Sequence, residues 1–264
     1  VYHYWKLRLS VTKHKDNDLI TLIKEIINKH KNRIGYRTVT DELRELGFVV
    51  NHKKVLRIMR ENNLLCTKFK HRNRTYKSYK GKVGKTAKNK LNRRFVTNRP
   101  YQKLLTDVTQ FNIRNGTKLY LSTIFDVCSK EIISYSISKR PTLEFVMESL
   151  LKAISVIPDL PYRTTIHSDQ GWQYQHKSWV QTLTKNRIIQ SMSRKGNCLD
   201  NSPMENFFGI LKQEIFYGET FDSYDELEEE IIDYIDYYNL VRKKRKLKSK
   251  TPVEYRNLAL MKVA

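Results

Sequence analysis

Three acidic side chains occupy positions at which a folded chain could use them for catalysis. Asp107 lies in the middle of an alternating, β-rich segment, where a charged side chain is disfavoured. Asp169 follows a short predicted strand, and open α/β sheets place their sites at the carboxyl ends of strands. Glu205 lies in the first turn of a predicted helix, beside the positive end of the helix dipole.

Carboxylates from three separate elements are the hard oxygen ligands that Mg²⁺ requires. Two such ions, roughly 4 Å apart, can deprotonate an attacking hydroxyl or water and stabilise the leaving oxygen of a phosphodiester. Any one of the three carboxylates could instead be solvated or satisfied by structural hydrogen bonds. The 35 residues between Asp169 and Glu205 (170 to 204) are weak evidence alone, because 27 of 264 positions are acidic. The metal-site hypothesis therefore depends on this spacing together with the three structural contexts and a basic chain.

The segment 202–212 has the pattern of a helix start. Pro203 suits the first helical position, and candidate N-caps precede it or lie beside it: Asp200, Asn201 and Ser202. Lys212 lies seven residues after Glu205, about two turns along the same face. A carboxylate and a cation on one face can hold a metal ion at one end and a phosphate at the other. The alternative is an amphipathic core helix whose Glu and Lys are solvated.

Residues near these carboxylates have hypothetical roles of their own. Asn201, one turn before Glu205, could orient that carboxylate or a metal-bound water, and it is counted among the expected DNA-binding residues; the alternative is a helix cap. Arg194 and Lys195 form a basic turn that could hold DNA, and the alternative is a solvated loop. Asp126 lies between two apolar residues and is expected to face outward from a strand.

The N-terminal part of the chain is predicted to be helical over 15–31, 40–46 and 51–62. Two short helices joined by a tight turn, the second of them basic, resemble a helix-turn-helix whose last helix enters a DNA groove. The cations expected to contact DNA lie on that helix: Lys53, Lys54, Arg57 and Arg60. A small helical bundle with a solvated basic face is the alternative.

The composition favours a polyanionic partner. Lys and Arg total 50 against 27 Asp and Glu, a formal charge of +23, and nucleic acid is the commonest such partner. Residues 67–100 are basic with little apolar periodicity, so they are expected to form an arm along a phosphate backbone or a disordered linker. No apolar run reaches the ~18 residues of a membrane span, and the three cysteines form no CxxC pair.

After Pro100 the pattern changes to that of a mixed α/β core. Three strands joined by short turns predict an antiparallel meander, and two further strands alternate with helices, giving the order βββαβαβα. The predicted strands cover 104–111, 119–127, 131–138, 163–168 and 187–192. The predicted helices cover 141–157, 175–185, a segment from 202 and about 223–239.

These segments resemble bacterial insertion-sequence transposases of the two-reading-frame kind, in their integrase-core product. The resemblance is carried by LLTDVTQF, HSDQG and NSPMENFFGILKQE, in which Asp107, Asp169 and Glu205 match the family's catalytic carboxylates. Lys212 matches a basic residue that contacts the element's end. A C-terminal signature is also matched by a set of separate residues and one run: Asn239, Arg242, Leu247 and 251–255. A Lys/Arg run follows Arg242 where the family often has His, so the role of this tail stays open.

The resemblance implies a ribonuclease-H-like fold and an Mg²⁺-dependent enzyme that cleaves element ends and joins the freed 3′-hydroxyl to a target phosphodiester. Two ions per site are expected, with Mn²⁺ substituting, and double-stranded DNA as substrate for a homo-oligomer. The expected parts are a helix-turn-helix-like region (1–66), a basic linker (67–100), a catalytic core (101–220) and a helical extension (221–264). The expected location is the cytoplasm, at the nucleoid when DNA is bound. The alternatives are a non-catalytic regulator that binds element ends and a hydrolytic nuclease of the same fold.

Overall fold

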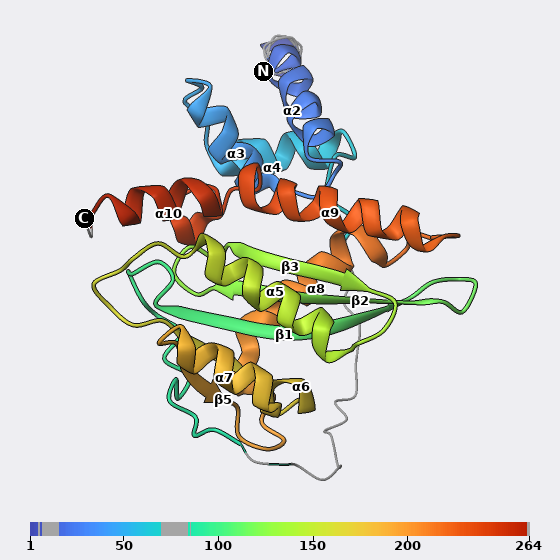
Figure 1. The fold of residues 1–264 in the computed structure, drawn as a ribbon. Helices are drawn as coiled ribbons and strands as arrows, with labels where there is room; N and C mark the ends of the chain where they lie inside the picture. The colour runs from blue at the N-terminus through green and yellow to red at the C-terminus, as the bar shows by residue number, and fades with distance from the viewer. Residues whose placement is uncertain (5, 7–15, 70–83, 85, 263–264) are drawn as a thin grey trace. The chain divides into compact units, whose positions relative to one another are not determined.

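The computed structural model describes residues 1–4, 6, 16–69, 84 and 86–262 (Figure 1). The chain folds as two units. One comprises Val1–His71 with Lys243–Ser249, and the other comprises Arg72–Arg242 with Lys250–Ala264. Each unit has a hydrophobic core of its own.

The core of the N-terminal unit is formed by the amphipathic helices α2 (Asn17–Lys29), α3 (Tyr36–Glu45) and α4 (His52–Glu61). They correspond to the three predicted helices, although α3 begins four residues earlier than predicted. Its N-cap is Gly35, which is extended, and the Thr40 hydroxyl donates to the Tyr36 carbonyl within the helix (2.6 Å). Asn51 caps α4 by accepting from the Lys53 N–H (2.8 Å).

The segment Lys243–Ser249 also belongs to this unit, and we call it the clip. It contains the short helix η3 (Arg245–Leu247), in which the Leu247 side chain is buried. Its contacts with α3 include several to acidic side chains: Lys243 to Glu42 and Glu45, and Arg245 and Ser249 to Asp41. Part of the Lys/Arg run whose role the sequence left open therefore neutralises the acidic side of α3.

Glu42→Gln is expected to lower the free energy of unfolding of this unit at pH 7 by about 1–3 kcal/mol. Burial by itself would raise the pKa of Glu42, but the His30 hydrogen bond and the charges of His30, Lys243 and Lys29 lower it to about 2. A carboxyl with a lowered pKa stabilises the fold above its unfolded pKa, here near 4.5, and loses that contribution as the pH falls toward 2.

Thermal unfolding of the Glu42 variant and the wild type at pH 7 and pH 3 measures this effect. The stability difference should shrink at pH 3, because Glu42 is then largely protonated in the unfolded chain and its ionisation in the folded chain contributes less stability. Glu25→Gln, at an exposed position of α2, is the matched control and should unfold like the wild type at both pH values. An equal loss at both pH values for Glu42→Gln would argue against the electrostatic cause.

The second unit is built on a five-stranded mixed sheet in the order β3-β2-β1-β4-β5 (Figure 1). The first three strands form the predicted antiparallel meander, while β4 and β5 run parallel to β1. The strands are β1 (Lys103–Asn112), β2 (Lys118–Asp126), β3 (Ile132–Ser138), β4 (Thr165–Ser168) and β5 (Ile189–Met192). The predicted order βββαβαβα is therefore confirmed.

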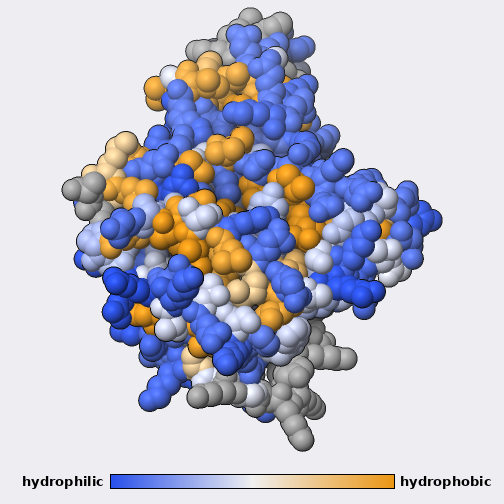
Figure 2. Space-filling view, in the orientation of Figure 1, coloured by the Kyte–Doolittle hydropathy of each residue, from blue (hydrophilic) through white to orange (hydrophobic). Residues whose placement is uncertain are grey.

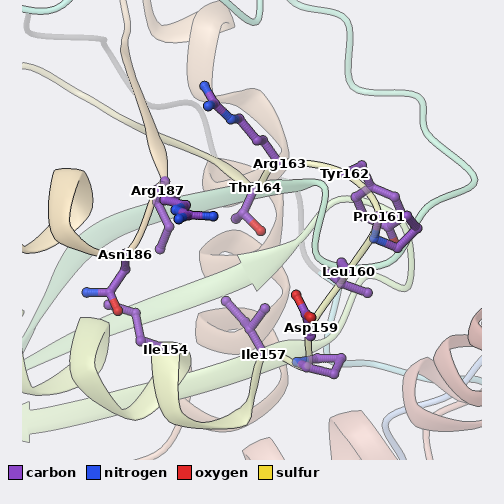
Figure 3. A pocket seen from close by; sticks show the side chains of 12 residues that line it. Ile154, Ile157, Asp159, Leu160, Pro161, Tyr162, Arg163, Thr164, Asn186 and Arg187 are labelled. Carbon is purple, nitrogen blue, oxygen red and sulfur yellow. The ribbon is translucent and has the colours of Figure 1, made fainter.

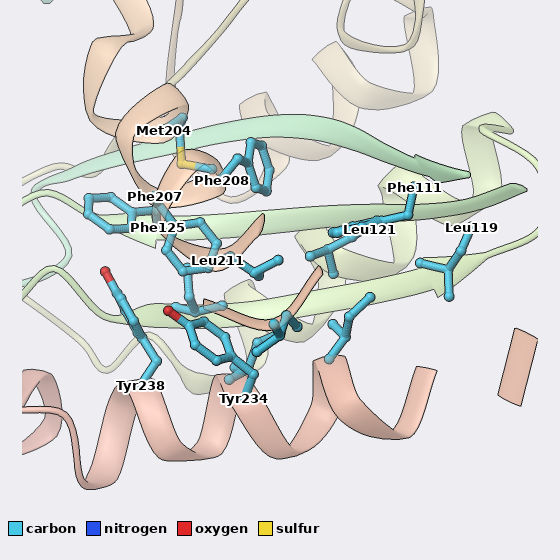
Figure 4. Close-up of a cluster of buried hydrophobic side chains, with 14 of the residues drawn as sticks. Phe111, Leu119, Leu121, Phe125, Met204, Phe207, Phe208, Leu211, Tyr234 and Tyr238 are labelled. Carbon is cyan, nitrogen blue, oxygen red and sulfur yellow. The ribbon is translucent and has the colours of Figure 1, made fainter. Parts of the chain in front are cut away.

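Helices cover both faces of this sheet. One core joins it to α5 (Leu143–Val156) and α7 (Lys177–Lys185), with the short α6 (Trp172–Gln175) beside them. The opposite core joins it to α8 (Ser202–Leu211) and α9 (Tyr224–Leu240). In Figure 4 the rings of Tyr234 and Tyr238 on α9 point from their helix toward the side chains of α8 and the sheet. The chain continues into α10 (Pro252–Leu260).

The part of the expected arm from residue 86 onward lies against this unit, and we call residues 86–100 the strap. The Lys90 N–H donates to the Ser191 hydroxyl on β5 (2.9 Å), and Leu91 is 3% exposed within the core beneath α8 and α9. The lack of apolar periodicity in this segment predicted that it would bury little surface. The buried Leu91 side chain and hydrogen bonds from the backbone nevertheless hold the strap on the second unit. The remainder, 70–83 and 85, lies outside the described residues.

The C-terminal signature residues of the second unit have structural partners. The Asn239 side chain both accepts from the Ile132 N–H (3.0 Å) and donates to its carbonyl (2.9 Å), so α9 is hydrogen-bonded to β3. Thr251 and Glu254 form a capping box at the start of α10.

No helix in the described part of the chain has the length and apolarity to cross a membrane. On the face drawn in Figure 2, apolar patches are interrupted by hydrophilic side chains.

Candidate active site

The sheet register brings Asp107 and Asp169 together. β4 pairs in parallel with β1, and Leu105 of β1 lies opposite His167 of β4. Asp107 and Asp169 each lie two residues beyond that pair, so continuing the register places them side by side and on the same face. Two residues 62 positions apart (169 minus 107) therefore meet where β4 ends.

The raised pKa of Asp107 is further evidence that Asp107 and Asp169 lie close together. Burial raises the pKa of Asp107 to about 8, and the negative charges of Asp169 and Glu205 add to this rise. The Val108 N–H, which donates to Asp107 Oδ1 (2.8 Å), and the charge of Lys212 oppose it. A cation bound beside Asp107 would therefore stabilise the ionised form of this carboxylate.

Asp169 is exposed as a whole residue, yet enough protein surrounds its carboxylate that desolvation raises its pKa. Its Oδ1 accepts from the Gly171 N–H (2.8 Å). A Cβ at Gly171 would lie 3.0 Å from that oxygen. Any other residue at position 171 would place its Cβ in close contact with the Asp169 carboxylate, so glycine is favoured in this turn.

Asp107→Asn is expected to stabilise the protein in EDTA at pH 7 by about 1–3 kcal/mol, because it removes a carboxyl whose ionisation is opposed by burial and by the neighbouring carboxylates. The sign follows from the raised pKa: between pH 3.8 and about 8 the unfolded chain releases a proton that the folded chain keeps on Asp107, so the destabilisation grows as the pH rises. Thermal unfolding across that range should show a gain that grows with pH. Asp159→Asn, at an exposed position, should show none, and a destabilised Asp107 variant would contradict the arrangement.

Glu205 lies in the first turn of α8 and is exposed, and partial desolvation raises its pKa. Its charge reaches Asp107. In the part of the chain that the structure describes, however, no three His, Cys, Asp or Glu side chains are gathered closely enough to hold a metal ion. The structure thus brings Asp107 and Asp169 together and leaves Glu205 on the neighbouring helix, so a shared metal site of all three stays a prediction.

Asn201 ends the short helix η1 (Cys198–Asn201) and lies at the N-cap of α8, but its side chain makes no capping hydrogen bond. Asn201 therefore occupies the cap position, as the alternative predicted, but its side chain does not cap the helix. Its Nδ2 lies 3.5 Å from Asp107 Oδ2 and 3.5 Å from the Thr106 carbonyl oxygen. Its Oδ1 is buried and has no hydrogen-bond partner among the described residues. The side chain is thus directed at Asp107, whereas the sequence pointed to Glu205.

Lys212 follows α8 and is held against the end of β1. Its Nζ donates to the Gln110 carbonyl (2.8 Å) and lies 4.9 Å from the centre of the Phe111 ring. The Lys212 ammonium group therefore contacts β1, the strand that carries Asp107. Contact between Lys212 and DNA stays a prediction.

The basic turn before η1 is anchored by a residue that the sequence suggested only as a helix cap. Arg194 donates from Nε and Nη2 to the two carboxylate oxygens of Asp200 (2.9 and 2.8 Å). The Asp200 side chain is fully buried. Lys195 is exposed. DNA contact by Arg194 or Lys195 stays a prediction, and Arg194 also holds the loop together.

Asp126 was expected to face outward, and that expectation is wrong. It is fully buried and accepts hydrogen bonds from the Ser129 N–H (2.9 Å), the Ser129 hydroxyl (2.7 Å) and the Tyr101 N–H (3.2 Å). β2 is buried at every position from Leu121 to its last residue, Asp126, so no outward-facing position is left there, and the carboxylate holds the turn that follows.

The four cations of α4 in the N-terminal unit divide into two pairs. Lys54 and Arg57 each form an ion pair with Asp16 (2.7 Å), a buried carboxylate before α2. Lys53 and Arg60 are exposed. All four stay predicted DNA contacts, but Lys54 and Arg57 also stabilise the unit.

A hollow lies away from these residues, at the amino ends of β4 and β5 (Figure 3). Its lining includes Asp159, Arg163 and Arg187. Asp107 and Asp169 lie at the opposite, carboxyl end of β4, where α/β sheets place their sites. We therefore do not assign this hollow to the candidate active site.

Comparisons with known proteins agree with this architecture. Residues 97–198 and 205–260 match two models, each described as an integrase core domain, and residues 14–73 match an HTH-like domain. The chain is 43% identical over 258 residues to the putative transposase InsK for insertion sequence element IS150 of Escherichia coli (strain K12). That match covers 98% of this chain and 89% of the relative. The chain belongs to the insertion-sequence transposases.

This transposase is also 45% identical over 222 residues to an uncharacterised transposase-like protein of Haemophilus influenzae, covering 84% of this chain and all of that one. Among solved structures, it resembles a chain of the simian T-cell lymphotropic virus intasome in complex with PP2A regulatory subunit B56 gamma. The TM-score is 0.50 at 18% identity, over 89% of this chain and 74% of that chain. This likeness concerns the fold alone, and it confirms the predicted ribonuclease-H-like core with an HTH-like helical region and C-terminal helices.

Proposed function

We propose that this transposase cleaves DNA strands at the ends of an insertion sequence and joins the freed 3′-hydroxyl to a target phosphodiester. The observation that carries the proposal is the pairing of Asp107 with Asp169 at the carboxyl end of β4, with Glu205 on the adjoining helix. Three carboxylates from a strand, a strand end and a helix start are suited to phosphodiester chemistry with divalent ions.

The side chains of Asp107, Asp169 and Asn201 offer oxygen donors of the kind that divalent cations bind. Asp107 and Asp169 are like charges that share a desolvated position, and Asn201 Oδ1 is a buried acceptor that lacks a partner among the described residues. We assign two Mg²⁺ ions, with Mn²⁺ able to substitute, to Asp107, Asp169 and Glu205. When bound, such ions neutralise the negative charge that develops on the attacking and leaving oxygens.

The chain's own groups position this chemistry. Because β1 and β4 are hydrogen-bonded neighbours, Asp107 and Asp169 keep a fixed separation along the sheet. The first turn of α8 favours an ionised Glu205 through the helix dipole. Lys212 supplies a positive charge at the end of β1, where a DNA phosphate can be held.

The N-terminal unit is proposed to bind double-stranded DNA at the element's terminal repeats. Its α3 and α4 are two short helices with a connecting turn, and α4 presents Lys53 and Arg60 at exposed positions. The strap and the residues before it are proposed to follow the phosphate backbone. Because two element ends must be paired, we propose that the protein acts as a homo-oligomer on DNA.

Lys53→Gln combined with Arg60→Gln is expected to weaken DNA binding and to reduce the salt dependence of binding. Each lost phosphate contact lowers the slope of log K against log[salt] by roughly 0.9, so the double variant should lose about 2. Fluorescence anisotropy with element-end DNA at several salt concentrations measures this slope. Lys24→Gln, at an exposed position of α2, is the control. A slope equal to that of the wild type would remove α4 from the proposed interface.

The proposed activity is tested by incubating the full chain with element-end DNA, a target plasmid and Mg²⁺ or Mn²⁺. The expected products are ends cut at the element boundary and ends joined to the target. Cleavage without joining would identify a hydrolytic nuclease of the same fold. Specific binding without cleavage in either metal would identify a regulator, and both outcomes would overturn the proposal.

A further inference from the structure

The loop before α8 is organised around a single buried carboxylate. Asp200 accepts five hydrogen bonds from three residues: Asn89 Nδ2 (2.9 Å), Arg93 Nε (2.9 Å) and Arg194 N, Nε and Nη2 (3.0, 2.9 and 2.8 Å). Its side chain is fully buried, although those of Arg93 and Arg194 are 43% and 57% exposed. The hydrogen bond from Arg194 lowers the pKa of Asp200 well below its usual range, so the group is charged at neutral pH.

This carboxylate fastens the strap to the loop. Asn89 and Arg93 belong to the strap, and Arg93 also donates from Nη2 to Asn197 Oδ1 (2.9 Å). The Ser191 hydroxyl on β5 accepts from the strap as well, and it contacts His167 Nδ1 on β4 (2.8 Å). The strap therefore joins the strand that leads to Asp169 with the loop that leads to Glu205.

The same loop ends at Asn201, the residue directly after Asp200. Asn201 is 5% exposed, and its Nδ2 lies 3.5 Å from Asp107 Oδ2. At this distance the hydrogen bond is weak, so small shifts of the loop decide whether it forms. Because Asp200 and Asn201 are consecutive residues of one short helix, holding the Asp200 side chain restricts the backbone that carries Asn201, and so restricts the positions that the Asn201 side chain can reach.

We propose that Asp200 is a positioning residue for the active site. Its charge holds Arg93, Arg194 and the strap so that Asn201 is aimed at Asp107 and its unpartnered Oδ1 faces the cation site. The proposal rests on the proposed function for the identity of that site. It assigns a role in active-site geometry to the strap, a segment that the sequence predicted to be part of a DNA-tracking arm or a disordered linker.

The test is a double-mutant cycle in the full chain with Asp200→Asn and Asn201→Ala. The first readout is the affinity for Mn²⁺ alone, from the electron paramagnetic resonance of free Mn²⁺ without DNA. Each single variant is expected to raise the Mn²⁺ Kd about tenfold, and the double variant no further than Asn201→Ala, because both act along one path. Independent effects, in which the two fold-changes multiply, would overturn the proposal.

The second readout is single-turnover cleavage of element-end DNA at saturating DNA. Asp200→Asn is expected to slow cleavage by about 100-fold, while the affinity for element-end DNA in EDTA changes by less than about threefold. A loss confined to DNA affinity would overturn the positioning role. If the wild type binds Mn²⁺ but cleaves no DNA, the proposed function fails. The positioning role of Asp200 is still tested in that case, because the double-mutant cycle measures Mn²⁺ affinity and not cleavage.

Two further variants separate positioning from general destabilisation. Arg93→Gln leaves Asp200 and Arg194 in place and removes one partly exposed cation of the strap, so it remains testable if Asp200→Asn does not fold. It is expected to raise the Mn²⁺ Kd about threefold and to have no further effect in the Asp200→Asn background. Glu131→Gln removes a different buried carboxylate, paired with Arg256 at 2.6 Å, and is the matched control. A Glu131 variant that weakens Mn²⁺ binding as much as Asp200→Asn would show that lost stability alone explains the effect.

Discussion

Glu205→Gln is expected to lower the rates of strand cleavage and strand joining by about 1,000-fold or more, with binding to element ends retained. The substitution keeps the size of the side chain and removes the charge that the candidate site obtains from α8. Asp107 and Asp169 are already adjacent, so the third carboxylate completes the ligand set expected for two ions. Cleavage of labelled element-end DNA in Mg²⁺ and in Mn²⁺ measures the effect.

The matched control for Glu205 is Glu144→Gln. Glu144 is also an exposed glutamate in the first turn of a helix, on α5 of the same unit. The two substitutions therefore cost similar helix-dipole energy, about 0.3–1 kcal/mol. Only the Glu205 variant should lose activity. If it keeps wild-type cleavage rates, Glu205 does not belong to the site and the assignment of α8 to catalysis fails.

Arg242→Met is expected to lower the free energy of unfolding by about 3–5 kcal/mol. Glu214, in the π-helical turn after α8 (Lys212–Phe216), is fully buried and accepts from Arg242 and from the Tyr234 hydroxyl (3.0 Å). Burial by itself lowers the pKa of Arg242, but the Glu214 charge raises it above its usual value. Removing the guanidinium leaves a buried carboxylate without a cation. Urea unfolding at pH 7 measures the loss.

The companion variant Arg242→Met with Glu214→Gln should recover much of that loss, because no unpaired charge then stays buried and Gln still accepts from Tyr234. Arg114→Met provides the exposed control. Its ion pair with Asp222 spans 3.8 Å and both side chains are at least 75% exposed, so its loss should be below about 1 kcal/mol. A double variant as unstable as Arg242→Met alone would mean that packing, not charge, makes Arg242 important.

The outcome for Arg242 bears on how its sequence motif is interpreted. The C-terminal signature left the role of this part of the chain open, and in the structure Asn239 and Arg242 hold α9 to the sheet and to the turn after α8. Leu247 is buried in the clip of the N-terminal unit. A motif shared within a family thus identified the family correctly, while its residues act here by packing and pairing.

The amino-acid sequence by itself determined the order and type of the elements and the two carboxylates that the sheet brings together. Periods of two and 3.6 residues are local properties, and a charge at a strand middle or strand end is visible without tertiary contacts. Which charges are paired was decided only by the tertiary structure. Asp200 meets Arg93 across 107 positions, and Asp16 meets Arg57 across 41. Such ion pairs form between segments that local patterns cannot bring together, because a charged side chain has the same signature whether it faces solvent, DNA or a buried partner.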